Sequence, residues 1–412
     1  MSRSAGSPDR VLTLPAAVRE AKCLRLKAIE SSTVRSRFLA ACALSALLAG
    51  GCGGEKKSPD AQGIPIGFFG ALSGPQATFA LSGKNGARLA ADQLNRAGGV
   101  LGKQLNLLIE DDHNEASEAA SAVSSLITRD HVVALIGENA SSRSLAAAPI
   151  AQNYQVPMVS PSSTNVAVTK KGDYIFRVCF VDSYQGKALA TFARQTLKAA
   201  TAALLVDAKS DYSVGLAEAF RQAFTGLGGN VVADLKYAEG DSDFSAQLTA
   251  IRPSRPDIIV VPGYYTDAGL IARQARGLGI EAALLGADGW DSPKLTEIGG
   301  AAVEGAYFSN HYSVEDPSPA VRAFVDEYRR VYGADPDSIA ALSYDAARLI
   351  ADAMRRAGST EGKRVRDALA ATKDFAGVTG RITMDADRNP VKPAVILKVE
   401  GGKFRFAASI AP

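Results

Sequence analysis

The stretch "VVALIGENASSRSLAAAPIAQNYQVPMVSP" (residues 132–161) contains the pattern that decides the fold. An apolar run precedes the polar segment "ENASSRS", and an alanine-rich segment then leads to a second apolar run. Apolar runs without polar alternation are typical of parallel strands that helices cover on both faces. The stretch therefore predicts a strand at 132–137, a helix near 142–154 and a second strand at 156–161.

The same alternation of strand and helix extends in both directions along the chain. Upstream, we expect strands at "IPIGFFGA" (64–71) and "KQLNLLIEDD" (103–112), with helices near 82–97 and 115–129. Downstream, the alternation restarts after "DYIFRVCFVDSYQG" (173–186), and the expected strands are "TAALLVDA" (201–208), "NVVADLKYA" (230–238), "PDIIVVPGY" (256–264) and "AALLGADG" (282–289). The helices expected between them lie near 185–198, 213–227, 243–253 and 266–278.

The last quarter of the chain differs from this alternation. Two amphipathic helices that end at glycine are expected near 317–332 and 337–358, and residues 380–406 are expected to form a β-meander. The sequence therefore predicts an α/β protein with two doubly wound parallel-sheet lobes in series. No Gly/Ser linker separates the lobes, so we expect the chain to cross between them several times. A cleft between such lobes is a usual place for a small ligand.

The net charge argues against nucleic acid as a partner. The 412 residues carry a formal charge of +3, but residues 1–51 alone hold eight Lys/Arg and three Asp/Glu. The remaining chain has 38 basic and 40 acidic residues, so no basic surface is expected on it.

The first fifty residues have the pattern of an export signal. The segment "VRSRFLAACALSALLAGGCGGEKKS" (34–58) has two arginines, an apolar core at 38–48 and small residues before Cys52. A core of this length is too short to span about 30 Å of hydrocarbon. An ordinary buried helix is the alternative, but the glycines around Cys52 would break it. The segment resembles a bacterial lipoprotein signal, which implies a signal peptide at 1–51, lipidation of Cys52 and a tether at 52–62.

This signal implies a protein of the periplasm or cell surface that a lipidated cysteine anchors to the membrane. The prefix 1–33 is unusually long for such a signal, so we also consider a translation start at Val34. After cleavage, Cys52 and Cys179 are the remaining cysteines, so no disulfide is expected.

The motifs of catalysis are absent from the sequence. Its three histidines fit no metal-binding spacing, and "DDH" (111–113) is more typical of a strand-end turn than of a metal pair. No nucleophile elbow, phosphate loop or dinucleotide fingerprint is present. We therefore predict no cofactor, no metal and no enzymatic activity.

Hydroxyl side chains gather where two neighbouring strands of the first lobe end. Ser141, Ser142 and Ser144 follow the strand at 132–137, and the segment 162–164 (Ser-Ser-Thr) follows the next one. Each serine could simply cap a helix. The alternative is an anion site, because the first turn of a helix offers unpaired N–H groups and partial positive charge.

The second lobe offers an acidic group at a corresponding place. Asp288 lies between Ala287 and Gly289 directly after an apolar strand, with Tyr264 and Trp290 as aromatic neighbours. "GADG" alone is more often a turn, but opposite an anion site it could hold an ammonium group.

These motifs together resemble those of the periplasmic branched-chain amino-acid-binding proteins, the leucine/isoleucine/valine-binding type that feeds an ABC importer. The resemblance covers residues 64–406, and its most specific motifs are "GALSGPQATF" (70–79), "GGVLGKQLNLLIEDD" (98–112), "VPMVSPSST" (156–164), "FRVCFVDSYQG" (176–186), "DYSVGLAEAF" (211–220), "PGYYTDAGLIARQAR" (262–276) and "LLGADGWDSP" (284–293). It implies two lobes of the type I periplasmic binding protein fold with a three-strand hinge. Lobe one would comprise 63–181 and 312–376, and lobe two 182–311 and 377–412.

The resemblance also assigns the roles of individual residues. Ser141 and Thr164 would hold the ligand's α-carboxylate. The backbone carbonyl of Ser162 would hold the ammonium group together with Asp288 and Tyr264. In addition, Tyr212 would reach the ligand from lobe two when the lobes close.

The side-chain pocket departs from that of the leucine-binding members. Phe79 stands where those members have an aromatic residue that carries a hydroxyl. Asn139 stands in place of an apolar residue, Ile339 in place of an aromatic residue, and Asp288 in place of a glutamate. The residues that would surround the ligand's side chain are Phe79, Asn139, Ala140, Ser163, Trp290 and Ile339.

The resulting hypothesis is a monomeric solute-binding lipoprotein that delivers an amino acid to an ABC permease by hinge closure. One alternative keeps the fold but binds an amide, urea or aromatic acid. A second is a lipoprotein that senses a ligand and signals to a membrane partner without delivering cargo. An enzyme is the third, and the missing catalytic motifs argue against it.

Overall fold

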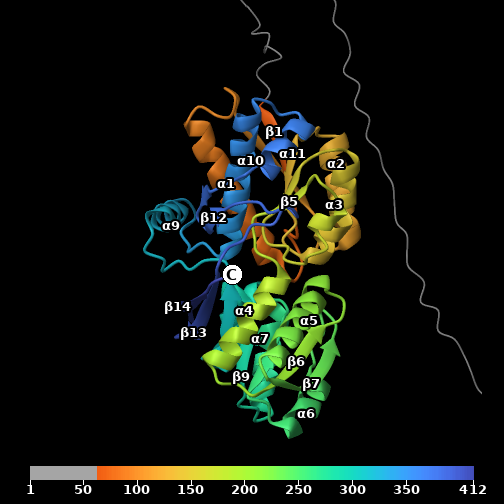
Figure 1. Cartoon of the computed structure of the whole chain (residues 1–412), viewed down its shortest axis with the longest axis vertical. Helices are drawn as coiled ribbons and strands as arrows, with labels where there is room; N and C mark the ends of the chain where they lie inside the picture. The colour runs from red at the N-terminus through yellow and green to blue at the C-terminus, as the bar shows by residue number, and fades with distance from the viewer. Residues whose placement is uncertain (1–62) are drawn as a thin grey trace, which may run out of the picture. The chain divides into compact units, whose positions relative to one another are not determined.

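The computed structural model of the protein describes residues 63–412 and shows two β-sheets, each flanked by helices (Figure 1). The α/β architecture with two doubly wound lobes that the sequence predicted is confirmed. The predicted signal peptide (1–51), Cys52, the tether (52–62) and the alternative start at Val34 lie outside the described residues. Within residues 63–412, no helix has the length and apolar character needed to cross a membrane.

The first sheet consists of five parallel strands in the order β2-β1-β3-β4-β5. Its strands are β1 (Ile64–Gly70), β2 (Leu105–Asp111), β3 (Ala134–Ile136), β4 (Met158–Ser160) and β5 (Ile175–Arg177). The central strand β1 pairs with β2 on one side and β3 on the other. This order brings the carboxyl ends of β1, β3 and β4 to one edge of the sheet, where the predicted hydroxyl groups follow.

Helices cover both faces of the first sheet, as its continuous apolar strands require. On one face α1 (Ala77–Arg96) packs with α10 (Ser338–Ala357), and on the other α2 (Ala116–Thr128) packs with α3 (Ser141–Asn153). Successive residues of a strand point to opposite faces. Phe68 therefore lies in the core beneath α1 and α10, whereas Phe69 lies in the core beneath α2 and α3.

The second sheet has seven strands in the order β14-β13-β10-β9-β8-β6-β7. They are β6 (Thr201–Asp207), β7 (Asn230–Tyr237), β8 (Ile258–Val260), β9 (Ala283–Gly286), β10 (Tyr307–Asn310), β13 (Ala394–Glu400) and β14 (Lys403–Ile410). Strands β6 to β10 run parallel, and the last two join the edge antiparallel. The helices of this lobe are α4 (Asp182–Gln195), α5 (Asp211–Gly226), α6 (Ser245–Ile251), α7 (Tyr265–Gly277) and α8 (Pro293–Gly299).

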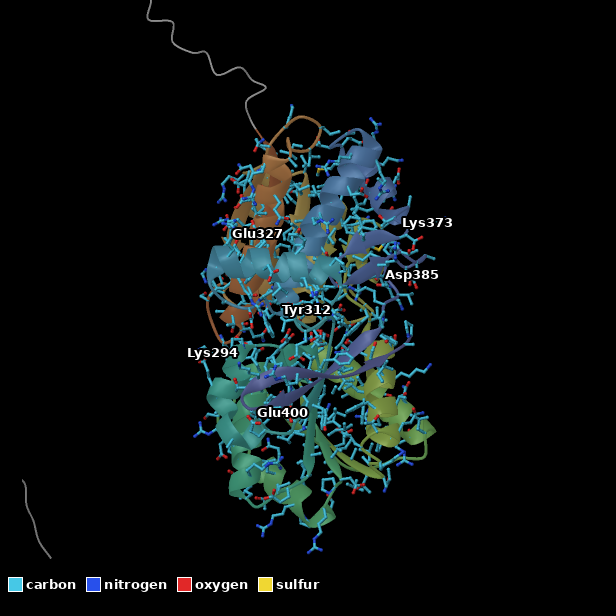
Figure 2. All side chains as sticks on the ribbon, turned by 90° about the vertical axis from the view of Figure 1, so that its left-hand side faces the viewer. Lys294, Tyr312, Glu327, Lys373, Asp385 and Glu400 are labelled. Carbon is cyan, nitrogen blue, oxygen red and sulfur yellow. The ribbon has the colours of Figure 1, made fainter. Side chains whose placement is uncertain are left out.

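The chain passes between the two sheets three times. It leaves the first sheet after β5, returns after β10 to form α9 (Pro319–Tyr332), α10 and α11 (Gly362–Ala370), and crosses again before β13. Short 3₁₀ helices lie at Thr169–Lys171, Arg252–Ser254, Asp288–Trp290 and Gly300–Val303. Tyr312 is buried just after the second crossing, where the lobes meet (Figure 2).

Two local expectations differ from the structure. The predicted β-meander at 380–406 is wrong in part, because β12 (Gly380–Ile382) pairs with β11 (Phe375–Gly377) and not with β13. The buried Asp345 carboxylate accepts hydrogen bonds from the backbone of Val378 (2.7 Å) and Thr379 (2.9 Å) and fixes this turn on lobe one. Ile382 and Met384 consequently pack into the core under α10, beyond the predicted lobe boundary at residue 376.

Helix α1 begins at Ala77 and not near residue 82. Its first turn therefore includes Phe79, which is buried among residues of the second lobe such as Tyr264 and Tyr265. This earlier start directs a lobe-one aromatic side chain toward the other lobe.

Candidate functional site

A small cavity lies between the carboxyl ends of the strands of the two lobes. Its lining residues are Phe79, Asn139, Ser141, Ser162, Tyr212, Tyr264, Asp288, Gly289 and Ile339. All except Gly289 are residues that the sequence analysis singled out. Most of them lie in the first turn of a helix or in the loop before it, because ligands of open α/β sheets bind where strands end and helices begin.

The lobe-one side of the cavity is built from hydroxyl groups that do not cap the helix they precede. Helix α3 has no side-chain cap hydrogen bond. Ser141 Oγ instead accepts from the backbone N–H of Asn165 at 3.1 Å, and Ser144 Oγ bonds Ser163 Oγ at 2.7 Å. The capping interpretation is therefore wrong for Ser141 and Ser144. The first-turn N–H groups of α3 keep their capacity to bind an anion.

The loop after β4 is fixed from behind by a buried arginine. Arg177 is fully buried and donates to the carbonyl oxygens of Ser163 (2.6 Å) and Asn165 (2.8 Å), which flank Thr164. Thr164 is itself buried, and its hydroxyl makes no strict hydrogen bond among residues 63–412, although it interacts with the carboxyl group of Asp182. The loop thus holds a hydroxyl with free hydrogen-bonding capacity in a fixed position close to the cavity.

The lobe-two side of the cavity is built around the carboxylate of Asp288. Its Oδ1 accepts hydrogen bonds from Tyr212 Oη (2.7 Å) and Gln185 Nε2 (2.7 Å), and its Oδ2 lies 3.1 Å from His311 Nε2. Gln185 also donates to Ser309 Oγ at 2.9 Å, which fixes its amide. Asp288 is therefore a buried carboxylate held by three side chains from three different elements.

Burial lowers the pKa of His311, although the adjacent Asp288 opposes this effect. A neutral His311 ring, stacked on Phe180 with centroids 3.9 Å apart, orients Asp288 without neutralising it. In the part of the chain that the structure describes, no Lys or Arg forms an ion pair with Asp288, and His311 is its one titratable basic neighbour at ion-pair distance.

A second carboxylate lies close to the same site. Both oxygens of Asp182, the first residue of α4, are buried, and neither makes a strict hydrogen bond within residues 63–412. Burial raises the pKa of Asp182 to about 8; the Thr164 hydroxyl opposes this rise, and the negative charge of Asp288 adds to it. Asp182 is therefore predominantly protonated at neutral pH.

Aromatic rings form the wall between the two polar sides. Tyr264 stacks on Tyr212 with centroids 5.3 Å apart, and the edge of Phe79 meets Tyr264 at 6.1 Å. Gly289 allows this packing, since a Cβ atom at that position would lie 2.6 Å from the carbonyl oxygen of Gly263 and 3.3 Å from the Tyr212 ring.

Hydrogen bonds around the cavity join the two lobes directly. Glu239 Oε1 of lobe two accepts from Gln76 Nε2 (2.7 Å) and Asn114 Nδ2 (2.9 Å) of lobe one. The backbone N–H of Asp211 donates to Ser142 Oγ at 2.9 Å. Within lobe one, the side chain of Arg143, ion-paired with Glu138 at 3.2 Å, donates to Gln76 Oε1 at 2.9 Å. The two lobes therefore contact each other around the cavity in this structure.

Three predicted pocket residues lie elsewhere. Trp290 is fully buried in the core of the second sheet, where its indole N–H donates to the carbonyl oxygen of Val261 at 3.1 Å. Ser163 is occupied by hydrogen bonds behind the cavity, including one to the carbonyl oxygen of Glu138 at 2.8 Å. Ala140 is buried at the lobe interface beside the cavity. The expectation that these three side chains line the cavity is not supported.

Four neighbours of the site escaped the sequence analysis: Arg177, Asp182, Gln185 and His311. The first three lie in the motif "FRVCFVDSYQG". This motif supported the family resemblance, but none of its side chains was predicted to lie at the site. His311 was considered only as a metal ligand. No group of three or more metal-ligating side chains is found within residues 63–412.

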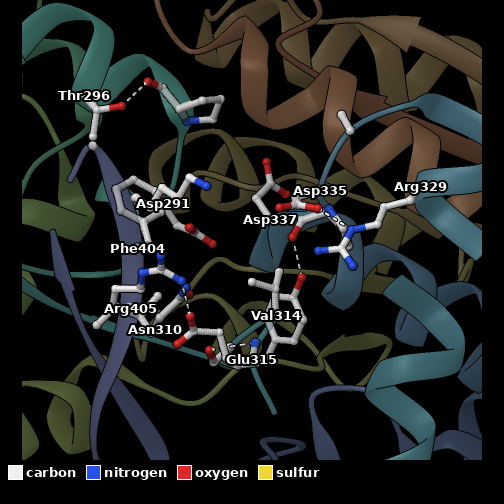
Figure 3. Close-up of a pocket in the computed structure, with 18 residues that line it drawn as sticks. Asp291, Thr296, Asn310, Val314, Glu315, Arg329, Asp335, Asp337, Phe404 and Arg405 are labelled. Atoms are coloured by element: carbon white, nitrogen blue, oxygen red, sulfur yellow. Dashed lines mark hydrogen bonds and ion pairs between the residues drawn. The ribbon is translucent and has the colours of Figure 1, made fainter. Parts of the chain in front are cut away.

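A larger groove lies at the hinge between α8, β10, β14 and the loop before α10 (Figure 3). Two charged pairs form within it: Arg329 with Asp335 at 2.5 Å, and Arg405 with Glu315 at 2.7 Å. Its buried carboxylates accept hydrogen bonds from outside the groove, Asp291 from the backbone N–H of Ser338 (2.6 Å) and Asp337 from Ser82 Oγ (2.6 Å). None of its lining residues has a buried polar side-chain atom without a partner. The groove therefore lacks the unsatisfied groups that the small cavity contains.

Comparison with known proteins identifies the class to which this fold and this cavity belong. The family of periplasmic binding proteins matches residues 63–403. The leucine-, isoleucine-, valine-, threonine- and alanine-binding protein of Pseudomonas aeruginosa is 31% identical over 352 residues, which cover 85% of this chain and 91% of that protein.

Solved structures agree with this assignment. The leucine-binding protein LivK of Thermotoga maritima has a TM-score of 0.82 at 40% identity and covers 85% of this chain and 99% of its own. LivJ of Streptococcus pneumoniae, crystallised with isoleucine, has a TM-score of 0.81 at 38% identity and covers 85% of this chain and 100% of its own. A solute-binding protein of R. palustris crystallised with benzoate covers 85% of this chain and 97% of its own with a TM-score of 0.78, but its 22% identity shows the fold alone.

The protein belongs to the periplasmic binding protein family. Its relatives include branched-chain amino-acid-binding proteins of ABC transporters, which bind solutes and are not enzymes.

Proposed function

We propose that this protein is the extracytoplasmic solute-binding protein of an ABC importer and that it binds an amino acid, branched-chain or similar, between its lobes. The observation that carries the proposal is the polarity of the cavity. Neutral donors from lobe one face it on one side, and the carboxylate of Asp288 from lobe two faces it on the other. A zwitterion with adjacent carboxylate and ammonium groups matches this arrangement.

In this proposal the α-carboxylate binds lobe one first. The hydroxyls of Ser141 and Thr164 and the first-turn N–H groups of α3 donate to it. Hinge closure then brings Tyr212, Tyr264 and Asp288 to the ammonium group. The ammonium group also donates a hydrogen bond to the backbone carbonyl oxygen of Ser162. Charge-assisted hydrogen bonds contribute about 1.5–3 kcal/mol each, so a few of them give about −8 kcal/mol, or micromolar affinity, after the cost of closure.

The partners follow from the same proposal. The closed surface docks on an ABC permease, and a lipidated Cys52 anchors the monomeric protein to the membrane. Cys52 lies outside the described residues, so mass spectrometry of the mature N-terminus is the measurement that checks it.

A ligand screen tests the proposal. Thermal-shift measurements should show stabilisation by L-leucine, L-isoleucine, L-valine or a similar amino acid, and none by amides, urea or benzoate. Ligand binding raises the unfolding temperature because it stabilises the folded state by mass action. Stabilisation by benzoate but by no amino acid would replace the zwitterion with an aromatic acid.

A further inference from the structure

The carboxamide of Asn139 is an unsatisfied polar group in the wall of the cavity. Asn139 follows β3, is only 6% exposed and lines the cavity. The Ser162 hydroxyl lies 3.0 Å from the Asn139 carbonyl oxygen and 3.4 Å from its Oδ1. Its Nδ2 is buried and has no hydrogen-bond partner within residues 63–412.

The apolar neighbours of Asn139 in the cavity cannot supply the missing acceptor. Phe79 and Ile339 share the cavity wall with it and offer only hydrocarbon. A buried amide donor without a partner destabilises the folded state, and native proteins rarely retain one without a role. We therefore expect the acceptor to arrive with the ligand.

The position of Asn139 indicates which part of the ligand carries this acceptor. This step rests on the proposed function, in which Ser141 and Thr164 bind the α-carboxylate and Asp288 binds the ammonium group. The acceptor must then belong to the ligand's side chain. Asn139 precedes Ser141 by two residues and bonds Ser162, so a ligand held by these two serines places the groups attached close to its α-carbon beside Asn139.

We infer that Asn139 is a specificity-determining residue and that the site prefers a short β-hydroxy aliphatic amino acid, L-threonine, over its isostere L-valine. The threonine hydroxyl accepts from Asn139 Nδ2, while the adjacent methyl group contacts Phe79 and Ile339. L-Valine has the same shape but leaves Nδ2 without a partner. The preference thus depends on one hydrogen bond and not on the volume of the cavity.

Isothermal titration of ligand-free protein with L-threonine and L-valine tests this inference. We expect the wild-type protein to bind L-threonine at least about tenfold more tightly, because a site built to bond a hydroxyl rejects an analogue that lacks it. Asn139→Leu should abolish or reverse this ratio. The control Asn153→Leu, at an exposed position at the end of α3, should retain it.

The outcomes separate this inference from the proposed function. If wild-type protein binds both amino acids with equal affinity, or L-valine more tightly, the role of Asn139 is refuted and the amino-acid site stands. If Asn139→Leu keeps the wild-type ratio, the preference has another origin and the inference also fails. If wild-type protein binds neither these two nor L-leucine, both proposals fail. The wild-type ratio alone decides if the Asn139→Leu variant does not fold.

Discussion

The hinge groove and the small cavity, two of the hollows between the lobes, differ in size and in how their polar atoms are satisfied. The hinge groove is the larger of the two, and two of its charged pairs, such as Arg329 with Asp335, form within the groove. The small cavity keeps the buried Asn139 Nδ2 in its wall, without a hydrogen-bond partner among residues 63–412. We therefore propose the small cavity as the binding site because of its unsatisfied polar group and not because of its volume. Replacements in the cavity should alter binding, whereas matched replacements in the groove should not.

The largest effect is expected for Asp288→Ala. This change removes the carboxylate that lines the cavity and takes an acceptor from Tyr212 and Gln185. We expect the dissociation constant for a bound amino acid to rise about 100-fold, since a hydrogen bond to a charged group contributes about 1.5–3 kcal/mol.

The matched control for Asp288→Ala is Asp335→Ala in the groove, where the carboxylate is exposed and paired with Arg329. Its dissociation constant should stay within about twofold of the wild type, since exposed ion pairs contribute little. Equal effects of the two changes in calorimetric titration would refute the ammonium role of Asp288.

A smaller effect is expected for Thr164→Val. The substitution keeps the shape of the side chain and removes a hydroxyl that makes no strict hydrogen bond within residues 63–412. We expect about tenfold weaker binding, because a hydrogen bond to the ligand's carboxylate is lost, while the unfolding temperature of the free protein stays unchanged or rises. Calorimetric titration and thermal unfolding measure the two quantities separately.

Thr296→Val is the corresponding control in the groove, where the hydroxyl donates to the carbonyl of Pro293 at 3.0 Å. It should leave affinity at the wild-type level. A Thr164→Val variant that binds as tightly as the wild type would exclude this hydroxyl from the carboxylate site.

The contacts between the closed lobes should contribute less to the affinity for a ligand. Their contribution should be the same for every amino acid that binds. Glu239→Ala removes the acceptor of Gln76 and Asn114 across the cleft. We expect affinity to fall about three- to tenfold for every bound amino acid, mainly through faster dissociation, because net hydrogen bonds contribute about 0.5–1.5 kcal/mol.

Stopped-flow dissociation with two different amino acids checks this expectation. Glu315→Ala, which breaks an ion pair with Arg405 in the groove, serves as its control and should not change the rate. A Glu239→Ala effect confined to one ligand would contradict a role in closure.

The last effect concerns the pH dependence of stability and not ligand affinity. Because burial raises the pKa of Asp182 from 3.8 to about 8, the folded protein keeps this proton at pH values where the unfolded chain has lost it. The free energy of unfolding should therefore fall as the pH rises from about 4 to about 8 through this group. Asp182→Asn removes that contribution. Its stability relative to the wild type should increase by at least about 1 kcal/mol between pH 5 and pH 8, since one pKa unit corresponds to about 1.4 kcal/mol.

Urea unfolding at the two pH values measures this difference. A difference that does not change with pH would show that the carboxyl group of Asp182 is ionised throughout.

Much of the fold and of the cavity wall could be predicted from the sequence because both follow local rules. Uninterrupted apolar runs mark covered parallel strands, and polar residues after them mark the edge where strands end. Ser141, Ser162 and Asp288 were found in this way, and the structure brings them together at one cavity. Their roles toward a ligand remain predictions.

What escaped prediction depends on distant packing. His311 and Gln185 reach Asp288 only because β10 and α4 lie beside it in the folded lobe. Trp290 follows Asp288 closely, yet it turns into the core because Gly286 leaves room for its indole. No local pattern distinguishes these cases. Similarly, the sequence of β12 resembles part of a meander with β13. In the structure, however, the buried Asp345 fixes the turn before β12 on lobe one.

The three passages between the sheets also affect how the protein is made. Strands β13 and β14 complete the second sheet, but they follow the whole of α9, α10 and α11 in the chain. The second lobe therefore lacks its edge during synthesis until residues 394–410 have emerged, and β10 stays open to wrong pairing until then. If the predicted signal directs export of the unfolded chain, this delay keeps the nascent chain from reaching its native state too early.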